Sequence, residues 1–232
     1  MRQWIQLLMF ALIAAVLCVV TGCTSNSRNG NVAEIRTVDA CPNGGNANVF
    51  INEGTASGVQ TFFQASPYLF IGSGTAGFQF TLSAAPGVNF TAANEAIAAG
   101  GVYSAVIVGR ADVTDEIDAR FPKLLFVQDD TGSVPAGSAA VRVLNAAPDS
   151  PNVDLVVDGT AKVSNISYAH NSGYVSVTAG SRSVQINQSG TSTALAGPQS
   201  LSFSPGKHYT VYVVEPNVTT PTFGIQVLSD NP

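Results

Sequence analysis

The feature that most constrains the fold is an internal repeat at a spacing of 106 residues. Residues 141–160 read VRVLNAAPDSPNVDLVVDGT, and residues 35–54 read IRTVDACPNGGNANVFINEG. Arg36 aligns with Arg142 and Pro42 with Pro148, while the alternating apolar positions stay in phase. Because successive side chains of a strand point to opposite faces, a kept alternation keeps the same face toward a core. The sequence therefore predicts two copies of one β domain.

The alignment continues beyond this segment without a net gap, and it pairs Tyr68 with Tyr174 and Tyr103 with Tyr209. The Gly-x-x-Tyr motifs at 100–103 and 206–209 resemble the tyrosine corner of immunoglobulin-like sandwiches, so we expect a structural role for both tyrosines. A repeat of this length is a duplicated domain, because solenoid repeats run about 20–50 residues. Gly132–Ser138, GSVPAGS, reads as a linker between the copies. We expect a signal segment at 1–22, a flexible tether at 23–31, a first repeat at 32–131, the linker at 132–138 and a second repeat at 139–232.

From Ala33 onward nearly every segment alternates with period two between clusters of Gly, Pro, Asn and Ser, which is typical of a sandwich or barrel. The segment 92–99, AANEAIAA, has a helical look, but its counterpart 198–205, PQSLSFSP, favours a strand in both copies. The predicted fold is all-β, with two tandem immunoglobulin-like antiparallel β-sandwich domains after an N-terminal signal helix. The expected strands are 33–40, 47–52, 58–64, 67–71, 76–83, 90–98, 102–110 and 123–129, then 139–146, 152–157, 162–167, 173–177, 182–188, 199–204, 208–215 and 222–228.

The N-terminus has a basic start at Arg2 and an apolar run from Trp4 to Val20, which indicates an export signal or a single-pass anchor. The run ends in Val20-Thr21-Gly22-Cys23, which resembles the lipobox of bacterial lipoproteins. That resemblance implies cleavage before Cys23 and lipidation of its thiol, and several acyl chains give a stable anchor. Thr24 rather than Asp favours the outer membrane, by analogy with enteric lipoprotein sorting.

Cysteine and charge content narrow the function classes. Cys18 leaves with the signal and Cys23 carries lipid, so Cys41 remains alone and no intramolecular disulfide forms. Cys41 aligns with Ala147, which favours a small buried residue over a nucleophile. The net charge is −5 and the Lys and Arg residues are scattered, which argues against a nucleic-acid partner.

Two short motifs resemble catalytic signatures but lack their context. The dinucleotide pattern GxGxxG at 72–77 needs a helix after its glycines, and an alternating strand pattern follows instead. The SxxK pattern at 204–207 contains Pro-Gly, which excludes the helix it requires. The histidines, His170 and His208, have no aligned partner histidine, so zinc or triad chemistry receives little support.

Two acidic groups are candidate ligand sites. The connection 110–121, RADVTDEIDARF, concentrates Asp112, Asp115, Glu116 and Asp118, and such oxygen ligands suit Ca²⁺, although a solvated acidic loop is the usual outcome. Around the repeated turn lie Asp149, Asp154 and Asp158. They either stabilise turns, with Asp158-Gly159 forming a type I′ hairpin, or line a ligand-binding end of the sandwich.

The phrases AAVRVLNAAPDSPNVDLVVDGT, SGYVSVTAGSRSVQI and SPGKHYTVYVVEP resemble the domain-of-unknown-function family 4397. The resemblance is close over 139–215 and looser over 33–129, where Asn43-Gly44-Gly45 replaces Asp149-Ser150-Pro151. It implies a tandem, exported all-β domain of the cell envelope, and it brings no catalytic residues or cofactor.

These observations predict a lipid-anchored, non-enzymatic envelope protein with a binding or spacer role. Its expected partners are the membrane, through the lipid, and polysaccharide or an envelope protein. The candidate contact aromatics are Phe62, Phe63, Tyr68, Tyr168 and Tyr174, although core packing is the alternative for most of them. The rival function is an envelope polysaccharide hydrolase with two carboxylates about 5–10 Å apart in a groove, and a weaker third is assembly of a surface layer through strand edges.

Overall fold

The structure is a computed structural model that describes residues 30–55, 60–87, 89–91 and 94–232. The predicted signal helix, Cys23 and nearly all of the tether lie outside the described residues. Every regular element in the described ranges is a β-strand. In this part of the chain no helix is long and apolar enough to cross a membrane.

The first repeat is built from two four-stranded sheets. One has the order β10-β9-β1-β4, the other has the order β3-β2-β6-β7, and a two-stranded β5-β8 piece extends the second layer. The strands are β1 Val32–Asp39, β2 Ala47–Ile51, β3 Gly54–Thr55, β4 Leu69–Gly72, β5 Gly74–Ala76, β6 Phe78–Leu82, β7 Asn89–Thr91, β8 Glu95–Ile97, β9 Val102–Val108 and β10 Lys123–Asp129.

The second repeat has the same plan, with sheets β14-β11-β17-β18 and β13-β12-β15-β16. Here single long strands, β15 and β16, take the places of the β5/β6 and β7/β8 pairs. The strands are β11 Ser138–Asn145, β12 Val153–Val157, β13 Thr160–Ile166, β14 Val175–Thr178, β15 Gly180–Gln188, β16 Ala194–Phe203, β17 His208–Asn217 and β18 Thr222–Ser229.

The strand pairing confirms the duplication. The first strand of each repeat pairs in parallel with its last strand but one, β1 with β9 and β11 with β17. The pair Val38↔Val106 recurs as Leu144↔Tyr212 at the same spacing of 106. The pairings of the remaining strands are antiparallel. The prediction of two tandem all-β sandwiches is thus confirmed. The parallel pairs β1–β9 and β11–β17 depart from the wholly antiparallel sheets that were predicted.

One predicted strand of the first repeat is wrong. In place of the predicted strand 58–64, Gln60 makes an isolated bridge to Ala47, and residues 61–64 belong to no strand. Residues 58 and 59 lie outside the described residues. Phe63 has φ 54°, a left-handed conformation that breaks a strand. The strand β8 confirms the preference for strand over helix at the end of 92–99.

The type I′ turn predicted at Asp158-Gly159 is confirmed, and the first repeat has the same turn. Asp158 and Gly159 have φ of 50° and 76°, as a type I′ hairpin requires, and their counterparts Asn52 and Glu53 have 48° and 67°. The hydroxyl of Tyr103 accepts a hydrogen bond from Ala98 N, and that of Tyr209 accepts one from Ser204 N, each at 2.9 Å. These are the expected tyrosine corners.

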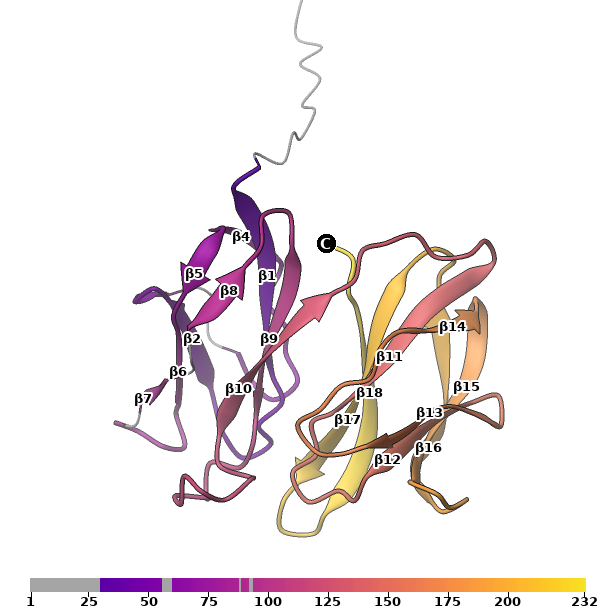
Figure 1. The fold of residues 1–232 in the computed structure, drawn as a ribbon. Coiled ribbons are helices and arrows are strands. Elements are labelled where there is room, and N and C mark those ends of the chain that lie inside the picture. Colours follow the sequence, from indigo (N-terminus) through magenta and orange to yellow (C-terminus); the bar gives the residue numbers. More distant parts are fainter. Residues whose placement is uncertain (1–29, 56–59, 88, 92–93) are drawn as a thin grey trace, which may run out of the picture.

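Each sandwich encloses its own apolar core, and a further cluster joins the two repeats. The sheet β10-β9-β1-β4 faces the sheet β14-β11-β17-β18 (Figure 1), and we call this contact the seam. Its buried members are Val38, Ala40, Val106, Val108, Val127, Leu144, Ala146, Tyr212 and Val214. As a result β1 is buried on both faces, with Ile35 toward its own core and Val38 toward the seam.

Candidate functional site

Two arginines cross the seam in opposite directions. From β1, Arg36 donates to Asp230 Oδ1 at 2.5 Å and to the carbonyl of Ser229 at 2.6 Å. From β11, Arg142 donates to Asp129 Oδ1 and, at 2.8 Å, to the carbonyl of Gln128. The two arginines are 3% and 2% exposed. Each repeat therefore bonds the end of the other repeat's last strand.

Hydroxyl groups complete both halves of this network. Arg36 Nε donates to Ser104, and Arg142 Nε donates to Thr210, each at 2.8 Å. Ser104 then donates to Asp129 and Thr210 to Asp230, each at 2.7 Å.

Two tyrosines supply the last donors. Tyr68 donates to Asp129 at 2.9 Å, and Tyr174 donates to Asp230 at 2.7 Å. The guanidinium of Arg36 lies 5.1 Å from the ring centre of Tyr68, and that of Arg142 lies 4.7 Å from Tyr174, a cation–π geometry. Burial raises the pKa of both phenols, so they remain protonated donors.

The repeat alignment finds part of this network. The arginines, tyrosines and hydroxyl residues keep the spacing of 106 residues, whereas Asp129 and Asp230 do not. The connection from β9 to β10 is longer than that from β17 to β18, which shifts the last strand out of register with the alignment. The signal available in the sequence was an arginine two positions before a buried apolar residue, Val38 or Leu144, which places both side chains on one face of the strand in each copy.

The network stabilises and orients, and its groups are poorly suited to proton transfer. Burial raises the pKa of Asp129, and the charge of Arg142 opposes that shift. Both carboxylates already accept bonds from an arginine, a hydroxyl and a phenol. A nucleophile or general base needs a free lone pair facing substrate, and this arrangement leaves neither carboxylate so disposed.

The connection 110–121, which follows β9, contacts the second repeat at another part of the seam. There its arginines bind the turn that contains Asp149. Arg110 contacts Asp149 Oδ2 at 2.5 Å, and Arg120 contacts Asp149 Oδ1 at 3.1 Å. The amide of Asp149 donates to Glu215 Oε2 at 3.0 Å. Asp149 was a candidate ligand residue. In the structure its carboxylate instead forms ion pairs with two arginines of the first repeat.

The candidate calcium ligands do not converge. Hydrogen bonds from Arg110 and Arg120 lower the pKa of Asp112 and of Asp118 to about 2. Asp115 accepts a bond from the amide of Ile117 at 3.1 Å, and Glu116 is exposed. Among the described residues no group of three or more His, Cys, Asp or Glu side chains is arranged to hold a metal ion.

Asp154 and Asp158 each serve a turn of their own repeat. Burial would raise the pKa of Asp154, but bonds from the amides of Asn165 and Gly190 outweigh it, so the net shift is downward. Asp158 accepts a bond from Ser183 N at 3.0 Å, and this bond first, then Arg182, lowers its pKa. The structure does not bring these carboxylates together with Asp149.

The candidate contact aromatics lie in or beside the seam. Phe62, Phe63 and Tyr168 pack against its apolar cluster, and Tyr68 and Tyr174 belong to the ion network. Cys41 is buried, and burial raises the pKa of its thiol to about 12, as expected for a packing residue. His170 is exposed on a turn, while His208 is buried with its ring against Tyr174.

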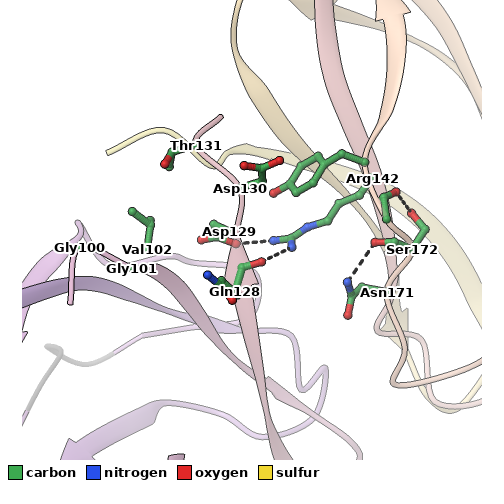
Figure 2. A pocket seen from close by; sticks show the side chains of 12 residues that line it. Gly100, Gly101, Val102, Gln128, Asp129, Asp130, Thr131, Arg142, Asn171 and Ser172 are labelled. Carbon is green, nitrogen blue, oxygen red and sulfur yellow. Dashed lines mark hydrogen bonds and ion pairs between the residues drawn. The ribbon is translucent and has the colours of Figure 1, made fainter. Parts of the chain in front are cut away.

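One open pocket of about 390 Å³ adjoins the Arg142 half of the network. Figure 2 shows Arg142 reaching across it toward Asp129 and the carbonyl of Gln128. Both repeats supply its walls: Gly100, Gly101, Val102, Gln128, Asp129, Asp130 and Thr131 from the first, and Arg142, Asn171, Ser172, Gly173 and Tyr174 from the second.

Comparison with known families agrees with this duplicated architecture. The family described as domain of unknown function (DUF4397) matches residues 33–156 and again residues 139–232. The chain belongs to the DUF4397 family. The first match extends through β11 into β12, so the two DUF4397 matches overlap at the start of the second repeat. No curated protein matches the chain.

Proposed function

We propose that this DUF4397 protein is a lipid-anchored, non-enzymatic module of the bacterial cell envelope, in which both sandwiches form one rigid body that holds a surface away from the membrane. The observation that carries this proposal is the reciprocal pair of buried contacts, Arg36 with Asp230 and Arg142 with Asp129. Interfaces between domains of one chain usually allow relative motion unless they are large and hydrophobic. The seam combines an apolar cluster with buried ion pairs, which suits a fixed arrangement.

The anchoring part of the proposal rests on the sequence Val20-Thr21-Gly22-Cys23. Residues 24–31, rich in Ser, Asn and Gly, would form a tether that reaches at most about 28 Å at ~3.5 Å per residue. Thr24 supports placement in the outer membrane. Rigid sandwiches on a short tether fit a spacer or a presenting platform.

The non-catalytic part is supported by four aspartates whose carboxylates already have partners. Asp129, Asp149 and Asp230 are each held by arginine, and Asp154 is held by backbone amides. The rival polysaccharide hydrolase would need a carboxylate pair free to face substrate. Hydrolysis of purified envelope polysaccharide by the wild-type protein would favour that rival.

Two measurements test the proposal. Metabolic labelling with a radioactive fatty acid should mark the wild-type protein, whereas Cys23→Ser should lose both label and membrane association. Spin labels on the exposed positions Glu53 and Ser200, in a Cys41→Ala background, should give one narrow distance distribution in the detergent-solubilised protein. An unlabelled wild type would refute the anchor, and a broad distance distribution would refute the rigid body.

A further inference from the structure

The pocket lies beside Arg142, and the repeat gives Arg36 the equivalent position in the other half of the seam. We call the surroundings of Arg36 the counterpart position. Comparing the two shows which residues both positions share, here called the frame, and which occur only in the pocket. Arg142, Tyr174 and Asp129 recur there as Arg36, Tyr68 and Asp230, because both halves of the seam need them. Ser172 recurs as Ser66, but the other side chains around this frame do not recur. Asn171 corresponds to Ala65, Gly173 to Pro67, and Asp130, which follows the seam aspartate, to Asn231.

The difference between Asp130 and Asn231 also changes which oxygen atoms can accept a hydrogen bond from a ligand. At the counterpart position Asn231 Oδ1 is used, since it accepts a bond from the amide of His208 at 2.7 Å. In the pocket, Asp130 Oδ1 accepts a bond from the amide of Gly132 at 2.8 Å, whereas its Oδ2 lies 4.0 Å from the ring of His208 and the side chain is 60% exposed. This long contact is the one that Asp130 makes across the seam among the described residues, so its Oδ2 can still accept a hydrogen bond from a ligand.

The pocket's lining is suited to hydroxyl groups. Asp130 and the amide oxygen of Asn171 are acceptors, whereas Gln128 offers both donors and an acceptor and Thr131 a hydroxyl. The Nδ2 of Asn171 donates to Ser172 O at 3.0 Å, which orients that amide. Walls of Gly100, Gly101 and Gly173 let a ligand approach the backbone closely.

The charges in the pocket disfavour anionic ligands. The guanidinium of Arg142 is already paired with Asp129, so it offers no free cation to a phosphate or a carboxylate. Asp130 adds a negative charge, which disfavours anions further. A volume of about 390 Å³ lies at the small end of the range for ligand pockets, a size that suits one or two sugar rings.

We propose that this pocket binds a neutral saccharide unit of an envelope polysaccharide, held by Asp130, Gln128, Thr131 and Asn171. The proposal rests on the envelope role proposed above and names the partner for it. The pocket exists only while the repeats are docked, because both of them supply its walls. Binding and the rigid seam are therefore linked.

The test uses the detergent-solubilised full chain and saturation-transfer NMR with three probes: chitobiose, maltose and inorganic phosphate. The decisive variant is Asp130→Asn with Asn171→Ala, which gives the pocket the residues that the counterpart position carries and that are therefore compatible with the fold. The matched control is Glu116→Gln with Gln199→Ala, an exposed carboxylate and an exposed amide outside the pocket.

We expect a saccharide to bind the wild type and the control equally, and the Asp130→Asn, Asn171→Ala variant about tenfold more weakly or worse. Absence of saturation transfer from both saccharides, equal binding by the variant, or preference for phosphate would each overturn the proposal. The acyl labelling and the spin-label distances do not depend on this result. A negative outcome here would leave the proposed anchor and rigid body standing.

Discussion

Arg36 and Asp230 lie 194 positions apart in the chain and form an ion pair of 2.5 Å in which the side chains are 3% and 0% exposed. Arg142 and Asp129 form the equivalent contact in the opposite direction. The interface is therefore self-complementary, like that of a twofold homodimer, although one chain provides both halves. Each half closes only when the other repeat is folded and docked.

The Arg36→Gln variant should lose about 3–5 kcal/mol of stability, because it leaves Asp230 buried without its charge partner. Urea unfolding followed by fluorescence measures the loss. The control is Arg182→Gln, which breaks the exposed pair with Asp158 and should cost no more than about 1 kcal/mol. Adding Asp230→Asn to Arg36→Gln should recover part of the loss, and full additivity of the two changes would contradict direct coupling.

The strands could be predicted from the sequence, whereas the ion pairs between the repeats could not. Alternation predicted most strands because a side chain's face follows from its parity, and the repeat predicted both tyrosine corners. The partners of Arg36 and Arg142 could not be predicted, because the longer β9–β10 connection places Asp129 and Asp230 out of the common spacing. Contacts between domains depend on docking, which periodicity does not encode. The roles of Asp149 and of the 110–121 connection were missed for the same reason.

Removal of the Asp149 carboxylate should loosen the second contact between the repeats. Asp149→Ala deprives Arg110 and Arg120 of their shared acceptor, and we expect a loss of about 1.5–3 kcal/mol in chemical unfolding, as for hydrogen bonds to charged groups. The control Asp158→Ala removes an aspartate from an exposed pair in the same repeat and should cost less. Equal costs would mean that Asp149 acts only within its own turn.

Asp39 gives the protein a pH dependence of definite sign. Burial raises the pKa of its carboxyl from 3.8 to about 7, and its Oδ2 has no hydrogen-bond partner. Between these pH values the folded state keeps a proton that the unfolded state has lost. Stability therefore falls as pH rises from about 4 to about 7, by at most on the order of 4 kcal/mol.

The second repeat supplies the matched variant for this carboxyl. Asn145 occupies the corresponding position, and its Oδ1 accepts the amide of Ala147 as Asp39 Oδ1 accepts that of Cys41. Asp39→Asn should therefore fold normally, exceed the wild type in stability at pH 8, and lose that advantage by pH 4. Thermal unfolding across this range measures the difference, and an advantage that does not vary with pH would contradict the raised pKa.

Gly109 connects β9 to the loop that holds Asp149, and it adopts φ +117°. A Cβ there would lie 2.7 Å from Pro122 Cα and 2.9 Å from the carbonyl oxygens of Arg120 and Phe121, so the backbone of the loop must move. Gly109→Ala should destabilise the protein by about 1–3 kcal/mol through strain and close contact. It should also weaken the hold of Arg110 and Arg120 on Asp149.

The control for this variant is Gly137→Ala, at φ +74° with nothing within 4 Å of the added carbon. It isolates the cost of the left-handed conformation, about 1–2 kcal/mol. If Gly109→Ala acts by moving the loop that carries Arg110 and Arg120, it has already weakened their contact with Asp149. The double variant with Asp149→Ala should then lose less unfolding free energy than the sum of the two single losses. Strict additivity in denaturant unfolding would show that Gly109 acts on β9 alone.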